Sequence, residues 1–273
     1  MLTPSEIANK AITIGENKAN LSCLNQFLLG TLAGAFIAFG AEASSMATHT
    51  IESANVAKFI GGLIFPAGLI MVLVAGAELF TGNSLMIISL AERKITLAKL
   101  LRSWLTVYLG NLAGSVLLAL LINLSGQLDI NSGLLGAYTI KTAANKVSLS
   151  FLNAFIMGIL CNWLVCLAVW MSFGADGFTG KALSAFFPIW VFVASGFEHS
   201  IANMYYISAG IFAKSNISYV KKALESGLSQ SAINNLAWPS MFVNNLLPVT
   251  LGNIIGGALF VGLIYWFIYR RGK

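Results

Sequence analysis

The feature that most constrains this chain is a set of long apolar stretches without Asp, Glu, Lys or Arg. A helix needs about 20 predominantly apolar residues to cross a bilayer. Six stretches approach or exceed that length: 19–41, 59–77, 103–128, 147–175, 182–197 and 226–269. With 57% hydrophobic and only 10% charged residues, the chain could not build a water-soluble surface without exposing large apolar patches. The sequence therefore predicts an all-α membrane protein whose six transmembrane helices are surrounded by a lipid bilayer.

The second and fifth stretches are shorter than the others, and each ends at a glutamate. Apolar sequence then resumes, over 79–91 after Glu78 and over 199–213 after Glu198. A carboxylate within a span is costly unless groups inside the protein satisfy it. We therefore expect the second and fifth transmembrane helices to be broken at these glutamates.

The basic residues predict the orientation of the chain. The net charge is +6, and the basic residues are scattered between the spans. This distribution is typical of residues that set membrane topology and argues against a nucleic-acid partner. Segment 92–102 holds four basic residues and is therefore expected in the cytoplasm, together with both termini, in a multi-pass protein of the inner (cytoplasmic) membrane. The other basic residues expected inside are Lys10, Lys18, Lys181, Arg270, Arg271 and Lys273, and those expected outside are Lys58, Lys141, Lys146, Lys214, Lys221 and Lys222.

Two polar segments are expected to hold short helices. In residues 1–18, apolar side chains recur at spacings of three and four after the candidate N-cap Ser5, which predicts an amphipathic helix on the cytoplasmic surface. Residues 214–238 form the longest polar connection. They predict an outer loop with a short helix around 220–227.

The two halves of the chain share motifs in the same order. Asn83 stands five residues after Glu78, and Asn203 stands five residues after Glu198. Further along, Gly-Asn-Leu-Ala-Gly at 110–114 matches Gly-Asn-Ile-Ile-Gly at 252–256. The glycines alone could serve only close helix packing, but charged and amide groups within spans are expensive and call for a specific role.

Three spans per repeat is an odd number, so the two halves must insert in opposite orientations. The sequence therefore predicts a single domain over 1–273, with inverted repeats at about 19–125 and 147–269. Folds of this kind place their transport site where broken helices meet near the middle of the membrane.

Three segments closely resemble the formate/nitrite transporter family: Gly-Ile-Leu-Cys-Asn-Trp-Leu-Val-Cys-Leu-Ala-Val-Trp-Met at 158–171, Gly-Phe-Glu-His-Ser-Ile-Ala-Asn-Met at 196–204, and Ala-Glu-Leu-Phe-Thr-Gly-Asn at 77–83. The resemblance implies an aquaporin-like six-helix protomer, a homopentamer with one pore per subunit, and transport of small monovalent anions with their conjugate acids. Formate is the expected substrate because the overall resemblance is to the formate channels, and hydrosulfide and nitrite are the alternatives.

The resemblance also implies roles for single residues. Thr81 matches the threonine of the loop that interrupts the second helix, His199 matches the central pore histidine, and Asn162 matches the amide that faces it. The other matches are Phe65 and Phe192 for an outer apolar constriction, Leu69 and Leu79 for an inner one, and Lys146 for the outer-vestibule lysine.

Charge energetics suggest how a small anion could pass such constrictions. A bare charge at mid-membrane costs from about 3 to well over 10 kcal/mol, whereas protonating a carboxylate of pKa about 4 at pH 7 costs roughly 4 kcal/mol. We therefore expect Lys146 to draw the anion in and the phenylalanine layer to strip its water. The acid form would then cross with hydrogen bonds from His199 and Thr81. The source of the proton, His199 itself or bulk water, is left open.

Glu78, Asn83, Glu198 and Asn203 are expected to be structural, with the carboxylates accepting backbone N–H bonds left unpaired at the helix breaks. A proton-carrying role for the glutamates is the alternative. No cofactor or metal is expected, and the three cysteines, which lie in apolar stretches without metal-ligand spacing, are expected to be buried.

The sequence fits two other function classes less well. A membrane-embedded enzyme could use Glu78, His199 and Glu198, but the sequence lacks a second histidine or cysteine set for a metal and lacks a nucleotide-binding motif. A neutral-solute pore of the aquaporin type would carry paired Asn-Pro-Ala boxes and a pore arginine, and neither is present in the broken spans. Both remain remote alternatives to an anion channel.

Overall fold

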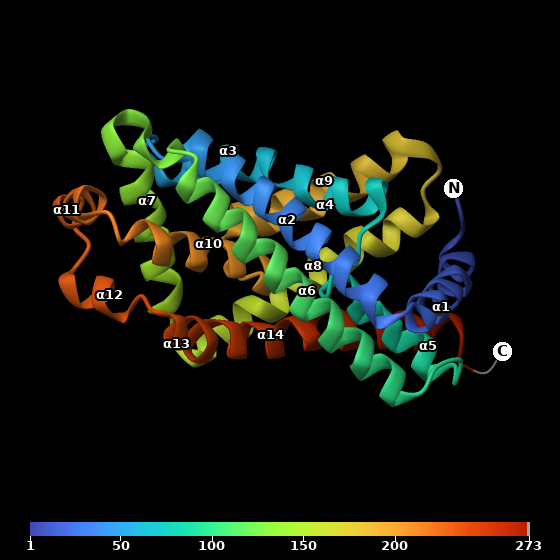
Figure 1. Ribbon diagram of the computed structural model, residues 1–273. Coiled ribbons are helices and arrows are strands. Elements are labelled where there is room, and N and C mark those ends of the chain that lie inside the picture. The colour runs from blue at the N-terminus through green and yellow to red at the C-terminus, as the bar shows by residue number, and fades with distance from the viewer. Residues whose placement is uncertain (272–273) are drawn as a thin grey trace.

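The computed structural model describes residues 1–271, and all their regular elements are helical (Figure 1). The first half contains α1 (Pro4–Asn20), α2 (Cys23–Thr48), α3 (Ala54–Ile64), α4 (Pro66–Met71), η1 (Val72–Gly76), η2 (Gly82–Met86), α5 (Ile87–Ala91), α6 (Leu97–Leu124) and η3 (Gln127–Asp129). The second half contains α7 (Ile130–Val147), α8 (Phe151–Gly174), α9 (Gly177–Ser195), α10 (Ser200–Ala213), α11 (Ile217–Glu225), α12 (Gln230–Asn235), α13 (Trp238–Ser240), η4 (Met241–Leu246), α14 (Leu247–Ile254), η5 (Ile255–Leu263) and α15 (Ile264–Tyr269). Lys273, counted above among the inner basic residues, lies outside the described residues.

Six helical stretches within residues 1–271 are long and apolar enough to cross a bilayer, which confirms the predicted number of spans: α2, Ala54–Gly76, α6, α8, α9 and Trp238–Tyr269. The shortest, α9, has 19 residues. At 1.5 Å per residue it is about 28 Å long, close to the ~30 Å thickness of the hydrocarbon core. The chain is thus a multi-pass membrane protein.

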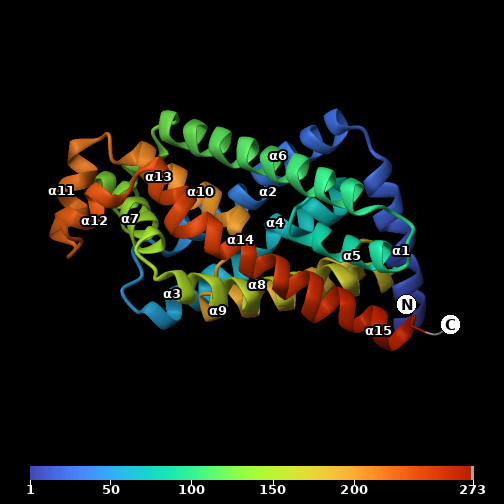
Figure 2. The same ribbon diagram turned by 90° about the horizontal axis from the view of Figure 1, so that it is seen from below.

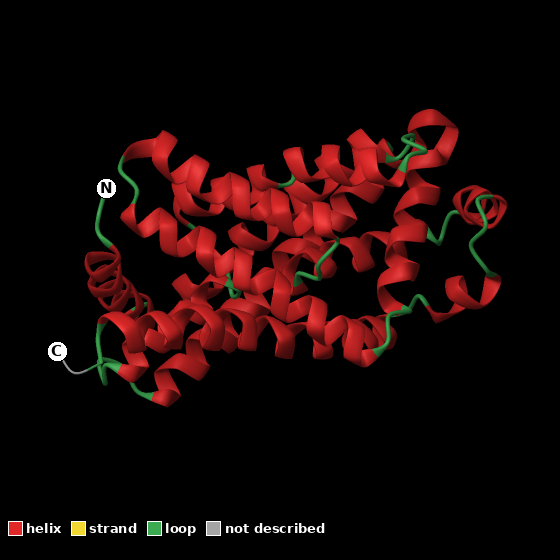
Figure 3. Ribbon diagram, turned by 180° about the vertical axis from the view of Figure 1, so that it is seen from behind, coloured by secondary structure: helices red, strands yellow, loops and turns green. Residues whose placement is uncertain are grey.

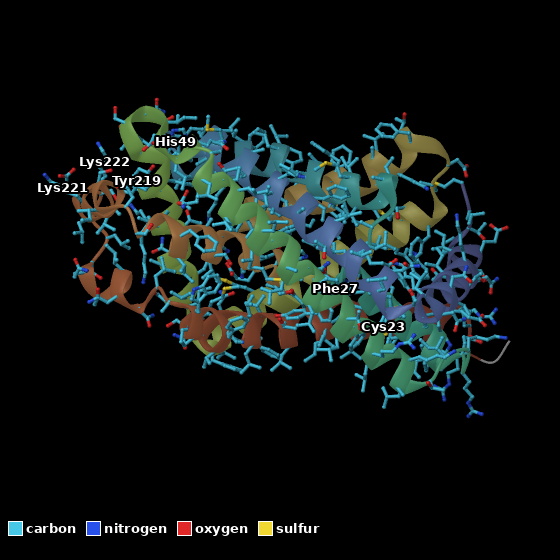
Figure 4. The ribbon with its side chains drawn as sticks, in the orientation of Figure 1. Cys23, Phe27, His49, Tyr219, Lys221 and Lys222 are labelled. Atoms are coloured by element: carbon cyan, nitrogen blue, oxygen red, sulfur yellow. The ribbon has the colours of Figure 1, made fainter. Side chains whose placement is uncertain are left out.

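Both termini lie at one end of the bundle, and α7, α11 and α12 lie at the other (Figures 1 and 2). The basic segment between α5 and α6 is at the same end as the termini, because Arg270 Nε donates to Glu92 Oε1 at 3.0 Å and Arg102 Nη2 donates to Ala19 O at 2.7 Å. The hydrogen bond from Arg270 also holds the pKa of the Glu92 carboxyl below its usual range. Lys221 and Lys222 lie at the opposite end (Figure 4).

The directions of α2 and α8 show that the halves are inverted. α2 starts beside α1 at the end with the termini, where Figure 4 labels Cys23, and reaches the other end near His49. α8 runs the other way, because its last residue, Gly174, accepts a hydrogen bond from Leu2 N at 3.0 Å. Cys23 is exposed at the start of α2, so the expectation that all three cysteines are buried is wrong for this residue.

The N-terminal helix forms as predicted, but its cap is Thr3 rather than Ser5. Thr3 Oγ1 accepts from Glu6 N at 3.4 Å, and Glu6 Oε2 accepts from Thr3 N at 2.7 Å. This reciprocal capping box satisfies two N–H groups that the first helical turn cannot pair, which a serine after Pro4 would not do.

The end of the bundle opposite the termini, which we name the outer end after the side of the membrane on which the sequence predicts it, carries more helix than the sequence predicted. The short helix expected around 220–227 is α11, which begins three residues earlier because Asn216 caps it by accepting from Ser218 N at 2.9 Å. The sequence did not predict α7, because its lysines are typical of a connection between spans. It packs against α10 and α11, and the Tyr219 ring lies directly over Gly136.

Glycines let the first and third helices of each half touch through their backbones. A Cβ on Gly114 would collide with the carbonyl oxygen of Thr31 in α2, and a Cβ on Gly256 would collide with that of Ile159 in α8. The α2–α6 pair is the most extensively packed in the bundle, and α8–α14 is the next. The repeated glycines therefore serve close packing, the alternative that the sequence left open for them.

Replacing either glycine by alanine is expected to lower the free energy of unfolding by at least about 2 kcal/mol, since the methyl group meets rigid backbone and the helices must separate. Thermal unfolding of detergent-solubilised Gly114→Ala and Gly256→Ala would show similar losses for both variants. Gly180→Ala is the control, because the nearest atom to a Cβ built on Gly180 is a side-chain carbon at 3.3 Å. Equal melting temperatures for all three variants would contradict this account of the packing.

Candidate functional site

Two helix breaks lie inside the bundle, as predicted, and loop segments interrupt the helices there (Figure 3). Residues 77–81 separate η1 from η2, and residues 196–199 separate α9 from α10. Gly76 and Gly196 end the preceding helices with φ of 83° and 73°, a left-handed conformation that favours glycine. The breaks leave backbone groups that would be unpaired in an apolar environment unless other parts of the protein bind them.

Two buried asparagines bind these backbone groups. In the first half, Asn111 Oδ1 accepts from Phe80 N at 2.9 Å, and its Nδ2 donates to Gly30 O at 2.8 Å and to Glu78 O at 2.9 Å. Each amide thus joins three spans of its own half. The two halves of the sequence share the motif around this asparagine, but the sequence indicated a role only for the glycines of the motif.

The second half repeats the arrangement atom for atom. Asn253 Oδ1 accepts from Ser200 N at 2.9 Å, and its Nδ2 donates to Gly158 O at 2.8 Å and to Glu198 O at 3.0 Å. This correspondence supports the predicted duplication at the level of single hydrogen bonds. The signal that could have revealed both residues was an amide at the same place in two charge-free spans.

Each break carries a lysine, glutamate and asparagine cluster. In the outer cluster, Lys146 Nζ lies 2.8 Å from Glu198 Oε1, and Asn203 Nδ2 donates to Glu198 Oε2 at 2.6 Å. The lysine and glutamate side chains are only 16% and 7% exposed. Lys146, which was expected to be the outer-vestibule lysine, is thus also the ion-pair partner of Glu198.

The inner cluster is built in the same way from Lys18, Glu78 and Asn83. Lys18 Nζ donates to Glu78 Oε2 at 3.0 Å and to Asn83 Oδ1 at 2.7 Å, and Asn83 Nδ2 donates to Glu78 Oε2 at 2.7 Å. The sequence had assigned Lys18 only to a surface helix.

The expected bonds of the two carboxylates were wrong in detail. Glu78 and Glu198 bind lysine ammonium groups and asparagine amides rather than the backbone N–H groups of the breaks, which the asparagines of the third and sixth spans serve instead.

His199 and Thr81 are brought together from the two breaks. His199 Nε2 lies 2.8 Å from Thr81 Oγ1, and both residues are buried. The other ring nitrogen, Nδ1, caps α10 by accepting from Ala202 N at 3.2 Å. Because a backbone N–H can only donate, Nδ1 carries no proton, and the proton of a neutral ring is on Nε2. His199 therefore donates to Thr81, whose own hydroxyl hydrogen is left for another acceptor.

A cavity of about 380 Å³ in the outer half of the bundle is lined by His199 but not by Thr81. Phe65 and Phe192 also line it, and their rings meet edge to face with centroids 5.5 Å apart. The Phe192 ring lies 6.0 Å from the His199 ring. The charged side chains in its wall are Lys58, Lys146 and Glu198.

The remaining matched residues lie away from this cavity. Leu69 and Leu79 are buried in the main core, at 1% and 3% exposure. Asn162 Nδ2 donates to Thr81 O at 3.2 Å and to Asn253 O at 2.6 Å, so this amide holds the backbone of Thr81 in addition to its implied place opposite the histidine. Within residues 1–271, no three His, Cys, Asp or Glu side chains lie close enough to hold a metal ion.

Replacing Asn111 or Asn253 by leucine is expected to lower the free energy of unfolding by at least about 2 kcal/mol, because buried backbone groups at a break lose their partners. Thermal unfolding should show equal losses for the two variants, since their bonds correspond. Asn153→Leu, at an exposed position of α8, is the matched control. A stable Asn111→Leu variant would mean that other groups satisfy the break.

Comparison with known proteins agrees with this architecture. The chain matches the family described as formate/nitrite transporter over residues 5–267. It is 41% identical to the formate channel FocA of Escherichia coli (strain K12), over 99% of this chain and 95% of the relative, and 37% identical to a probable formate transporter of Methanothermobacter thermautotrophicus, over 98% and 97%. A solved pentameric formate channel with formate bound superposes with a TM-score of 0.81 at 39% identity, over 90% of this chain and 97% of that one. An FNT family ion channel gives 0.80 at 30% identity, over 96% and 98%. The chain belongs to the formate/nitrite transporter family.

Proposed function

We propose that this protein is a channel for small monovalent anions and their conjugate acids, with formate as the main substrate. The observation that carries the proposal is the buried His199–Thr81 pair, in which His199 lines the outer cavity beside the Phe65 and Phe192 rings. Several relatives named for formate support formate over other anions. Hydrosulfide and nitrite remain the alternatives, because both can also cross as neutral acids.

The substrate crosses the phenylalanine layer as the neutral acid. The two rings offer a passing ion no full charge of opposite sign, and a bare charge there would cost from about 3 to well over 10 kcal/mol. Neutralising a carboxylate of pKa about 4 at pH 7 costs only roughly 4 kcal/mol. Beyond the rings, the free hydroxyl hydrogen of Thr81 donates to the acid's carbonyl oxygen while His199 holds the hydroxyl in place.

The proton comes from water in the outer cavity rather than from His199. Protonating His199 fully would put a hydrogen on Nδ1, facing the Ala202 N–H that it now accepts from, and α10 would lose its cap. The neutral ring keeps both bonds. His199 thus acts as a fixed donor that orients Thr81, and proton and anion enter together.

The proposal includes the number of subunits and the orientation of the protein in the membrane. The name of the matched pentameric channel supports a homopentamer with one passage per subunit. The basic segment 92–102 lies at the same end as both termini, which supports placing that end in the cytoplasm and the outer cavity on the other side of the inner membrane.

Proteoliposomes test the proposed function. Formate uptake should rise as external pH falls from about 7.5 to 5.5, because each unit increases the acid fraction about tenfold. Nitrite and hydrosulfide should compete with formate to an extent that ranks the three substrates. Glycerol should not permeate, and its entry at the rate of formate would instead indicate a neutral-solute pore. Chemical alteration of formate would indicate an enzyme.

His199→Asn tests the source of the proton. Asparagine can still cap α10 but loses the bond to Thr81, so the maximal rate should fall about tenfold, as expected for one lost hydrogen bond. The pH profile should match that of the parent protein. A flattened profile would show that His199 delivers the proton.

Thr81→Val should lower the rate at least as much, because it removes the hydroxyl that the acid accepts from, while Thr81→Ser should retain most of it. If Val and Ser behave alike, the hydroxyl is not used.

A further inference from the structure

Lys58 is on α3 and lines the outer cavity. Its Nζ would be 3.4 Å from a Cβ built on Gly196, and its Cε would be 3.8 Å from the same point. The ammonium group therefore rests against the residue that ends α9, and the absence of a side chain on that residue leaves room for it. Lys58 is itself exposed and forms part of the cavity wall.

The two lysines of the cavity differ in how far their charges are compensated. Lys146 Nζ is 2.8 Å from Glu198 Oε1 and lies over the Tyr206 ring, 5.3 Å from its centroid. At distances much larger than this separation, the positive charge of Lys146 and the negative charge of Glu198 cancel. Lys58 has no hydrogen-bond or ion-pair partner within residues 1–271, so the net positive charge of the cavity wall is the charge of Lys58.

The helix end beside Lys58 holds its ammonium without neutralising it. The carboxyl end of a helix carries only a partial negative charge, about half an elementary charge, which favours a nearby cation. Lys58 thus keeps most of its field for an entering anion. A carboxylate partner, such as Glu198 provides for Lys146, would remove that field.

We propose that Lys58, rather than Lys146, concentrates small monovalent anions in the outer cavity. This inference rests on the proposed function. It gives Lys58 the role of attracting the anion, which was expected of Lys146 from the sequence. Lys146 instead positions the outer helix break through Glu198. A positive charge raises the local anion concentration and lowers the local proton concentration by the same factor, so Lys58 does not change the equilibrium concentration of the neutral acid. It changes how much formate must be present outside before the cavity holds an anion, and this occupancy sets the half-saturating concentration.

The test is formate uptake into proteoliposomes at two ionic strengths. At about 0.01 M salt the Debye length is about 30 Å, and at 1 M it is about 3 Å. Lys58→Met should raise the half-saturating formate concentration about threefold to tenfold at low salt, as expected for one partly screened charge several ångströms away. The difference should fall below about twofold at high salt.

Matched variants separate charge from shape. Lys58→Arg should keep the parent's half-saturating concentration, and Lys58→Glu should raise it beyond Lys58→Met at low salt. Lys141→Met is the control, because Lys141 lies on the neighbouring α7, donates to Ser226 O at 3.1 Å and does not line the cavity. It should behave as the parent at both ionic strengths.

Two outcomes overturn the inference while leaving the proposed function intact. One is a parent-like half-saturating concentration for Lys58→Met at low salt. The other is an equal change in the Lys141→Met control, which would indicate the charge of the whole outer face. If Lys58→Met unfolds in a melting assay, the comparison of Lys58→Arg with Lys58→Glu decides the question in its place. A parent protein that carries no small anion would contradict the proposed function itself.

Discussion

The fold depends on satisfying broken backbone inside an apolar bundle. A transmembrane helix normally pairs all its own N–H and C=O groups, so an interruption at membrane depth is stable only if side chains supply the missing partners. Asn111 and Asn253 do so with three hydrogen bonds each, all between 2.8 and 3.0 Å. These amides let each span be interrupted, and the interruptions in turn allow side chains from the two halves to meet in the middle.

The two halves share a scaffold but differ in chemistry. Asn83 N donates to Leu79 O and Asn203 N donates to His199 O, both at 2.9 Å, so the leucine and the histidine occupy equivalent positions of the two breaks. One break thus presents a hydrocarbon side chain where the other presents an imidazole, and the imidazole bonds to Thr81 of the opposite break. The two halves thus share the bonds that hold the breaks and differ in the side chains that face the middle of the bundle.

Much of this fold was predictable from the sequence, because its strongest signals are local. The apolar stretches gave the six spans, and Glu78 and Glu198 marked both breaks, since carboxylates are rare in spans. The sequence offered a signal for the two bridging asparagines, but their partners and the partnership of Lys18 with Glu78 were not predictable, because these bonds depend on how distant helices cross. α7 was missed because its lysines resemble those of a loop. The family resemblance supplied Thr81 and Asn162, whose bonds no spacing rule could have predicted.

The asparagine that bridges each break binds residues of its own half of the chain. Asn111 binds only to residues that precede it, from Gly30 to Phe80, and Asn253 binds only to residues from Gly158 to Ser200. During synthesis, the first half can therefore reach a stable arrangement in the membrane while the second is still on the ribosome. The bonds of Thr81 to His199 and to Asn162 join the two halves, so the paired site exists only when the second half has packed against the first.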